Sequence, residues 1–105
     1  MRNRISIFIR RLREDQRSPN WQTLRDTHLE LNNICAWCGS NRDLEVHHIK
    51  PFHLYPELEL EPRNLVTLCE SIGRNCHLER GHLGSWRKFN PLLLEEIEAH
   101  HSYPV

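Results

Sequence analysis

The sequence predicts an α+β fold with a two-stranded core, flanked by helices and held together by a bound metal ion. The run LEVHHI at residues 44–49 alternates apolar and polar side chains, and NLVTLC at residues 64–69 is almost continuously apolar, which predicts two short strands. Four cysteines stand in two pairs around these strands. With 105 residues, of which 38% are hydrophobic, we expect one domain, residues 1–105, with a core that needs such a metal to be stable.

Helical spacing predicts an N-terminal helical arm over residues 1–32. A first apolar stripe over residues 3–16 consists of Ile5, Phe8, Ile9 and Leu12. Ser18 followed by Pro19 is typical of an N-cap and a first helical position, and a second stripe then runs to about Asn32. His28 lies on this second stripe, so we expect a core or edge histidine there rather than a ligand.

The remaining segments complete the expected core at residues 35–80 and a C-terminal helix at residues 90–101. Three prolines punctuate the connection between the strands, and its alternating glutamates, Glu57, Glu59 and Glu61, predict a half-exposed extended segment. CHLER predicts a short helix after the second strand, stopped by Gly81 and Gly84. Asn90-Pro91 is typical of the start of the last helix, LLLEEIEAHH.

Charge and hydropathy narrow the choice of partners. The formal net charge is zero, but residues 1–25 carry seven arginines and two acidic residues, a net +5, whereas the remainder carries seven basic and twelve acidic residues, a net −5. A basic arm suits contact with a polyanion, although an arginine-rich helix face exposed to water has the same composition. The absence of a run of eighteen apolar residues and of a signal-like N-terminus predicts a cytoplasmic protein without a membrane partner.

The cysteines have the spacing of a structural zinc site. Cys35 and Cys38 form a C-x-x-C pair, and Cys69 and Cys76 form a wider pair about thirty residues later. Four thiolates can surround Zn²⁺ as a tetrahedron, with Zn–S distances near ~2.3 Å. The redox alternative treats Cys35-Ala-Trp-Cys38 as a thioredoxin-like motif, but that reading expects a βαβ context and leaves the second pair without a purpose.

Taken together, VHHI, Arg63-Asn64-Leu65 and Cys76-His77 resemble the HNH endonuclease family in its zinc-ribbon-containing form, over about residues 35–80. The resemblance implies a ββα-metal fold and cleavage of phosphodiester bonds in DNA. It implies His48 as the general base, His47 and His77 as metal ligands, Asn64 as the residue that holds the base-bearing strand, and the four cysteines as zinc ligands. Stand-alone members of this family often occur in phages and mobile elements. The second cysteine pair, stretched by ESIGRN, and the long loop between the strands depart from the family pattern.

The chemistry gives an independent reason for two adjacent histidines. Neighbouring side chains on a strand point to opposite faces, so one metal cannot be held by both from the same side. Hydrolysis by in-line displacement needs an activated water on one side of phosphorus and charge stabilisation at the departing 3′ oxygen on the other. We therefore expect His48 at the water and His47 at a divalent cation such as Mg²⁺, Mn²⁺, Ni²⁺ or Zn²⁺.

Other candidates are weaker. His82, five residues after His77, would lie about ~140° away on a continuous α-helix, and it becomes a third metal ligand only if Gly81 breaks that helix. His53 fits a loop, His100 and His101 fit the end of a helix, and the tryptophans fit packing around the cysteine turn and helices. We expect backbone phosphates to be held by Arg63, Arg74, Arg80 and Lys88.

Two non-catalytic alternatives stay open at this level. One is a zinc-ribbon nucleic-acid-binding module, which the basic arm and the cysteines favour. The other is a zinc-stapled protein-interaction domain, which the zero net charge and the apolar stripes of the terminal helices favour. The nucleic-acid-binding module has no use for His48 or Asn64. The sequence specifies neither a monomer nor a dimer.

Overall fold

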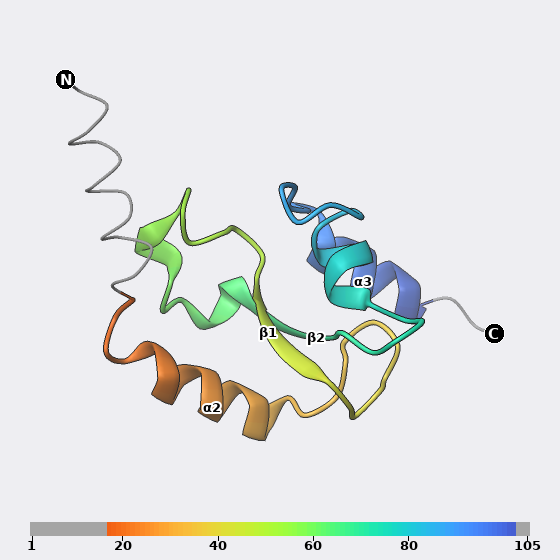
Figure 1. Ribbon diagram of the computed structural model, residues 1–105, viewed down its shortest axis with the longest axis horizontal. Helices are drawn as coiled ribbons and strands as arrows, with labels where there is room; N and C mark the ends of the chain where they lie inside the picture. Colours follow the sequence, from red (N-terminus) through yellow and green to blue (C-terminus); the bar gives the residue numbers. More distant parts are fainter. Residues whose placement is uncertain (1–16, 103–105) are drawn as a thin grey trace.

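The computed structural model describes residues 17–102, so the predicted helix at residues 3–16 lies outside the described residues. Within this range the chain forms helix α2 (Trp21–Leu31), strands β1 (Leu44–His48) and β2 (Leu65–Cys69), the helical turn η3 (His77–Gly81) and helix α3 (Leu93–Ser102) (Figure 1). Two short 3₁₀ turns, η1 (Pro56–Leu58) and η2 (Pro62–Asn64), lie between the strands. The predicted α+β class is confirmed.

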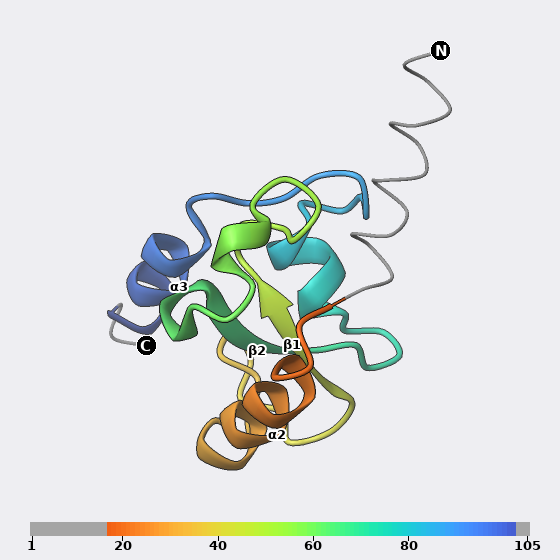
Figure 2. The same cartoon turned by 90° about the vertical axis from the view of Figure 1, so that its left-hand side faces the viewer.

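The two strands form one antiparallel hairpin at the centre of the fold. Leu44 pairs with Cys69 at one end of the ladder and His48 pairs with Leu65 at the other. Helix α2 and the turn η3 both contact both strands, and they lie on opposite sides of the hairpin (Figures 1 and 2). Side chains that alternate along β1 therefore reach two different environments.

The hydrophobic core joins β2, the first cysteine turn and α3. Every residue of β2 is buried, and Leu68, Cys69 and Leu93 are fully inaccessible to solvent. Ile97 of α3 and Trp37 of the cysteine turn pack against this cluster. The small number of buried aliphatic side chains agrees with the expectation that the core needs additional stabilisation.

The helix starts differ from the predicted ones by a few residues. Helix α2 has Asn20 at its N-cap, because Ser18 instead begins a tight turn in which its carbonyl accepts from the Trp21 amide (3.0 Å) and its hydroxyl accepts from the Asn20 amide (3.1 Å). Helix α3 begins at Leu93 rather than at residue 90. Asn90 fixes that start, since its side-chain oxygen accepts from the Leu92 amide at 3.0 Å.

The segment with the alternating glutamates is not extended, which corrects the sequence-based prediction. Pro56 and Pro62 each open a 3₁₀ turn, because a fixed proline φ suits the first positions of such a turn. As a result Glu59 turns inward and is only 6% exposed. Among the described residues, no helix has the length and apolar character needed to cross a membrane.

Candidate active site and metal centres

The four cysteines converge on one point beside the hairpin. Their sulfur atoms all lie within 4.8 Å of one another, and Cys38 Sγ is 3.7 Å from Cys69 Sγ. A tetrahedral zinc with Zn–S bonds of ~2.3 Å places its sulfur ligands ~3.8 Å apart, so this separation suits a shared ion and is far longer than a disulfide bond. The donor set and its spacing therefore fit zinc.

Local turns bring the cysteines together despite the wide second pair. In the first turn the Cys35 amide donates to the Ser40 carbonyl at 2.7 Å. In the second, the chain reverses between Ser71 and Arg74 through Gly73, whose φ of 81° is one that few other residues adopt. The Arg74 carbonyl then lies 3.3 Å from Cys69 Sγ. The six residues ESIGRN thus form a compact hairpin turn that returns the chain to the cluster.

Burial and hydrogen bonding set the protonation of the thiols in opposite directions. Burial raises the pKa of Cys35 and, with the charge of Cys35, that of Cys76. Burial also disfavours the thiolate of Cys69, but hydrogen bonds from the backbone of Cys76 and Ser71 outweigh it and lower the pKa to about 7. Thiols held this close are readily deprotonated when a cation binds, which is how structural zinc sites form.

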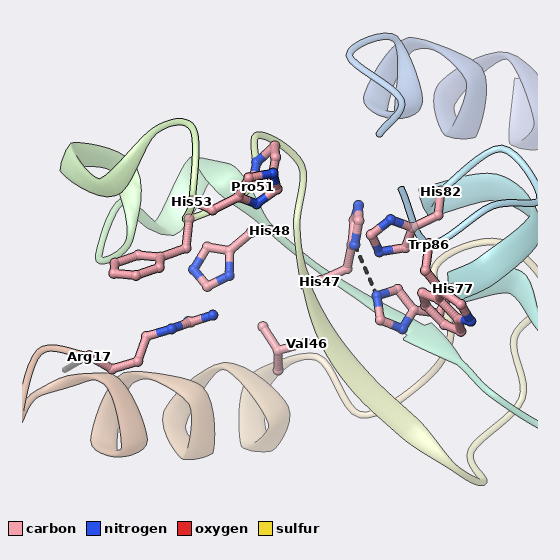
Figure 3. Close-up of a pocket in the computed structure, with 10 residues that line it drawn as sticks. Arg17, Val46, His47, His48, Pro51, His53, His77, His82 and Trp86 are labelled. Atoms are coloured by element: carbon pink, nitrogen blue, oxygen red, sulfur yellow. Dashed lines mark hydrogen bonds between the residues drawn. The ribbon is translucent and has the colours of Figure 1, made fainter. Parts of the chain in front are cut away.

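Three histidines converge where the turn η3 packs against β1. Ring nitrogens of His47, His77 and His82 lie within 4.8 Å of one another, and His47 Nδ1 is 3.0 Å from His77 Nε2 (Figure 3). The turn η3 explains how His82 joins them. It is a π-helical turn, in which the His82 amide donates to the His77 carbonyl five residues earlier (3.1 Å). The wider turn brings side chains at i and i+5 together, which an α-helix would separate.

Hydrogen bonds orient two of these imidazoles toward the centre. His77 Nδ1 contacts Glu70 Oε2 at 2.6 Å, and His82 Nδ1 donates to the Lys88 carbonyl at 2.7 Å. Each ring therefore turns its Nε2 inward as an acceptor, and that of His77 lies 3.0 Å from His47 Nδ1; such second-nitrogen contacts are typical of metal-binding histidines. Burial lowers the pKa of His82, so that its ring stays neutral near pH 7.

His47 is the most buried histidine of the cluster. Burial, reinforced by repulsion from the neighbouring histidines, lowers its pKa to about 3, and its ring is 2% exposed. Its Nε2 is buried without a hydrogen-bond partner among the described residues. A buried nitrogen without a partner is a costly arrangement unless a cation binds it together with the two neighbouring imidazoles. The three imidazoles together fit a divalent transition-metal ion.

His48 lies on the opposite face of β1, in contact with α2. Its Nε2 donates to the Glu59 carbonyl at 2.9 Å, and its ring is tilted against Trp21 with the centroids 4.5 Å apart. The bond to a carbonyl fixes the tautomer, because only a protonated Nε2 can donate there, and it leaves Nδ1 as an acceptor. Burial lowers the pKa of His48, so the ring is neutral near pH 7.

Asn64 closes the segment that follows β1. Its side-chain oxygen accepts from the Lys50 amide (2.8 Å), and its amide group donates to the carbonyls of Lys50 (3.0 Å) and Leu58 (3.3 Å). It is 6% exposed. The contacts tie the turn two residues beyond His48 to the end of η2 and to η1, and so limit movement of the strand end that carries both histidines.

One pocket joins the two faces of the strand. It has a volume of about 400 Å³, and both His47 and His48 line it, with the other two clustered histidines on the far side of β1 (Figure 3). Trp86 lies against His77 and His82, at centroid distances of 5.1 and 4.9 Å, yet is 53% exposed. Trp86 therefore packs against these two histidines and also forms part of the pocket wall.

The expected phosphate-binding residues lie elsewhere. None of Arg63, Arg74, Arg80 and Lys88 lines the histidine pocket among the residues that the structure describes. Arg74 and Arg80 border a second pocket beside the cysteines, where the Arg80 guanidinium covers Trp37 at 4.2 Å. Lys88 contributes its backbone carbonyl to His82 instead. His101 donates to the Ala36 carbonyl (2.6 Å) and His100 stacks on Trp37, so neither approaches the pocket.

Three residues at the pocket had not been assigned a role from the sequence. Glu70 contacts His77, Glu59 contacts His48, and Arg17 is the cation that lines the pocket within residues 17–102. Glu70 directly follows Cys69, so its position next to a zinc cysteine was a usable signal. Glu59 and Arg17 gave no such signal, because their placement depends on how the loop and the segment before α2 fold back.

A hairpin followed by a helical turn, with histidines on both and a cysteine cluster beside them, is a ββα-metal domain. Residues 35–83 match the family model described as HNH endonuclease. This match indicates a nuclease or another nucleic-acid-related function. Comparison with curated proteins and with solved structures finds no match.

Proposed function

We propose that this protein is a metal-dependent DNA endonuclease that hydrolyses phosphodiester bonds, with His48 as the general base. The observation that carries the proposal is the pocket around the end of β1, which has a neutral imidazole with a free Nδ1 on one side and three inward-facing imidazoles on the other. A phosphodiester bound between them would meet a base and a cation site on opposite sides, as in-line displacement requires.

In this proposal His48 Nδ1 accepts a proton from water as the water oxygen attacks phosphorus. The new P–O bond forms while the bond from phosphorus to the 3′ oxygen breaks. The resulting imidazolium is stabilised by its Nε2–H bond to the Glu59 carbonyl (2.9 Å), which also prevents the ring from turning away. Asn64 supports the base indirectly, through its bonds to Lys50 and Leu58.

His47, His77 and His82 would hold the catalytic divalent ion. When bound there, such an ion supplies positive charge that stabilises the departing 3′ oxygen. Glu70 would fix the orientation of His77 through their 2.6 Å contact. Cys35, Cys38, Cys69 and Cys76 would hold a separate zinc ion with a structural role, since their four sulfur donors leave no open position for a substrate.

A plasmid-nicking assay tests the proposal. Wild type is compared with His48→Ala in the presence of Mg²⁺, Mn²⁺ or Ni²⁺, and we expect a loss of about 10²- to 10⁴-fold in rate from removal of the base. His53→Ala is the matched control, because this exposed histidine lines the same pocket and no role is assigned to it. Wild type that binds DNA without cleaving it would instead favour a zinc-ribbon binding module, and equal cleavage by wild type and His48→Ala would exclude this base.

A further inference from the structure

Glu59 is a buried carboxylate that the proposed reaction does not use. Both of its side-chain oxygens accept from the Ser18 amide, at 3.2 and 3.3 Å, and Oε2 lies 3.8 Å from Arg17 Nη1. Its backbone carbonyl is also the partner of His48 Nε2. One residue therefore contacts the segment before α2 through its side chain and the candidate base through its backbone.

The Glu59 carboxylate needs these contacts because it is buried. An ionised carboxylate that is 6% exposed needs donors close by, because removing it from water unpaired is costly. The donors found for it within residues 17–102 are the Ser18 amide and the Arg17 guanidinium. The carboxylate consequently fixes the backbone at residues 17–18 against the loop between the strands.

Arg17 is held beside the base but keeps most of its hydrogen-bonding capacity. Its guanidinium lies over the ring of Phe52 (4.4 Å to the centroid) and near Trp21 (5.4 Å), and its side chain is 38% exposed. The single contact to Glu59 is long, and no hydrogen bond donated by the guanidinium is found among the described residues. A guanidinium has five N–H donors in a geometry that matches phosphate oxygens. Figure 3 shows Arg17 on the same side of β1 as His48.

We propose that Glu59 is a positioning residue that holds Arg17 and His48 on one wall of the pocket, so that the Arg17 guanidinium binds a non-bridging phosphate oxygen of the DNA while His48 acts on the water. The proposal rests on the nuclease function proposed above. It adds a substrate-binding residue from outside the matched segment 35–83 and explains why a carboxylate is buried next to a site for a polyanion. A simpler role for Glu59, as a cap of the turn before α2, would involve no connection with the substrate.

The test is a double-mutant cycle in the full chain. Single-turnover nicking rates at saturating protein are measured for wild type, Arg17→Gln, Glu59→Gln and the double variant. Glu59→Gln keeps the volume and an oxygen that accepts from Ser18, but removes the charge that attracts Arg17. Glu57→Gln and Arg25→Gln are matched controls, because Glu57 is exposed in the same loop and Arg25 pairs with Glu45 (3.3 Å) outside the pocket. Melting curves establish that all variants fold.

We expect Arg17→Gln to slow nicking roughly ten- to a hundredfold, the loss typical of one charge-assisted hydrogen bond. Glu59→Gln should slow it about severalfold to tenfold. It should have no further effect when Arg17 is already glutamine, because the lost charge acts through Arg17, whereas the contact to His48 comes from the Glu59 backbone carbonyl, which glutamine keeps. Independent, multiplicative effects of the two substitutions, or an unchanged rate in Arg17→Gln, would overturn the proposal.

A binding measurement separates this proposal from the nuclease function. DNA affinity is measured by fluorescence anisotropy with His48→Ala as the background, so that no cleavage interferes. Arg17→Gln should weaken binding about tenfold and reduce the slope of log K against log salt by about one. If wild type does not nick but this effect appears, the catalytic function fails and the Arg17 contact stands. If wild type nicks DNA but Arg17→Gln changes neither DNA binding nor the nicking rate, the proposed Arg17 contact is wrong and the nuclease function stands.

Discussion

His47 and His48 are neighbours in the sequence with different surroundings. His47 faces η3, where burial and two other imidazoles lower its pKa to about 3. His48 faces α2, where a carbonyl and an indole hold a neutral ring with one nitrogen free. A strand is the element that gives adjacent residues such different environments, since its side chains alternate between faces. The proposed roles of His48 as base and His47 as metal ligand are thus compatible with the backbone geometry of β1.

The partner of His77 gives a prediction at a single side chain. Glu70→Gln keeps the shape of the side chain but removes the charge that polarises the His77 ring through the 2.6 Å contact. We expect the affinity of the histidine site for a divalent ion such as Ni²⁺ to fall about 10- to 100-fold. Isothermal titration of zinc-loaded protein measures this affinity. Glu79→Gln, an exposed neighbour on η3, is the control, and equal affinities for Glu70→Gln and wild type would contradict the prediction.

His28 gives a prediction about pH and stability. Its Nε2 is buried without a partner among the described residues, and burial lowers its pKa below the ordinary 6.5. Above about pH 6.5 the ring is neutral in both states, so it adds no pH dependence. As pH falls below that value the unfolded chain takes up a proton that the folded chain resists, and stability is lost.

His28→Leu removes this loss, because leucine cannot titrate and the site is bordered by apolar residues such as Leu65 and Val66. We therefore expect the free energy of unfolding of His28→Leu, relative to wild type, to rise as pH is lowered from 7.5 to 5.5. Urea denaturation at the two pH values provides the measurement. A difference that stays constant with pH would show that His28 titrates equally in both states.

At the residue scale, the sequence predicted which residues form the two clusters better than it predicted their contacts with neighbouring side chains. His47, His48, Asn64, His77 and the four cysteines were nominated from their order and spacing, and the structure brings the histidines to one pocket and the cysteines to one cluster. Their chemical roles stay predictions. The cations predicted to hold phosphates do not line the histidine pocket, because exposure and charge do not reveal which cation the fold brings there, and their contact with phosphate stays a prediction. Arg17 lines the pocket instead, 3.8 Å from the inward-turned Glu59.

The π-helical turn η3 is the element that completes the histidine cluster. An α-helix over CHLERGH would direct His77 and His82 about ~140° apart. The extra residue in the turn instead aligns them, and π turns often occur at functional sites for this reason. Sequence periodicity could not predict this alignment, since residues five positions apart do not lie on the same face of an α-helix. Gly81 was expected to interrupt the helix, and it lies inside the turn itself.

Gly81 therefore gives a test at the level of this element. A Cβ at residue 81 would lie 3.1 and 3.2 Å from two ring atoms of His47 and 3.2 Å from Leu68 Cδ1. Gly81→Ala gains up to ~1 kcal/mol in helix propensity, which offsets part of the overpacking cost of ~1–3 kcal/mol. We expect a small change in thermal stability but weaker Ni²⁺ binding, because the crowded ring is the buried ligand His47.

Gly84→Ala is the control for this variant. Its φ of 85° makes alanine strained there, but a Cβ would meet nothing within 4 Å. We expect Gly84→Ala to lower the melting temperature without changing the affinity of the histidine site, the opposite pattern. Metal affinity that is unchanged in Gly81→Ala would show that the His47 ring can move away without cost, and that close approach of η3 to β1 is not required.

At the scale of the whole molecule, the cysteine cluster and the histidine cluster share the same short stretches of chain. Cys69 is followed by Glu70 and Cys76 by His77, so each cysteine of the second pair directly precedes a residue of the histidine site. Holding the two thiolates on one ion would fix both His77 and the carboxylate that orients it. The core is small, with Leu68, Cys69 and Leu93 at its centre, and it surrounds the cysteine cluster itself.

This arrangement predicts that loss of a cysteine unfolds the domain, whereas loss of His48 lowers the reaction rate without lowering stability. Structural zinc contributes ~10 kcal/mol or more of folding free energy, which exceeds the net stability that a small core supplies alone. We expect Cys35→Ser and Cys69→Ser to be unfolded at 25 °C and to lose Ni²⁺ binding at the histidine site as well, whereas His48→Ala melts like wild type. Circular dichroism melts, with zinc counted by mass spectrometry, measure this contrast. Folded Cys→Ser variants with an intact histidine site would show that the hairpin and α3 hold the active site without the cysteine cluster.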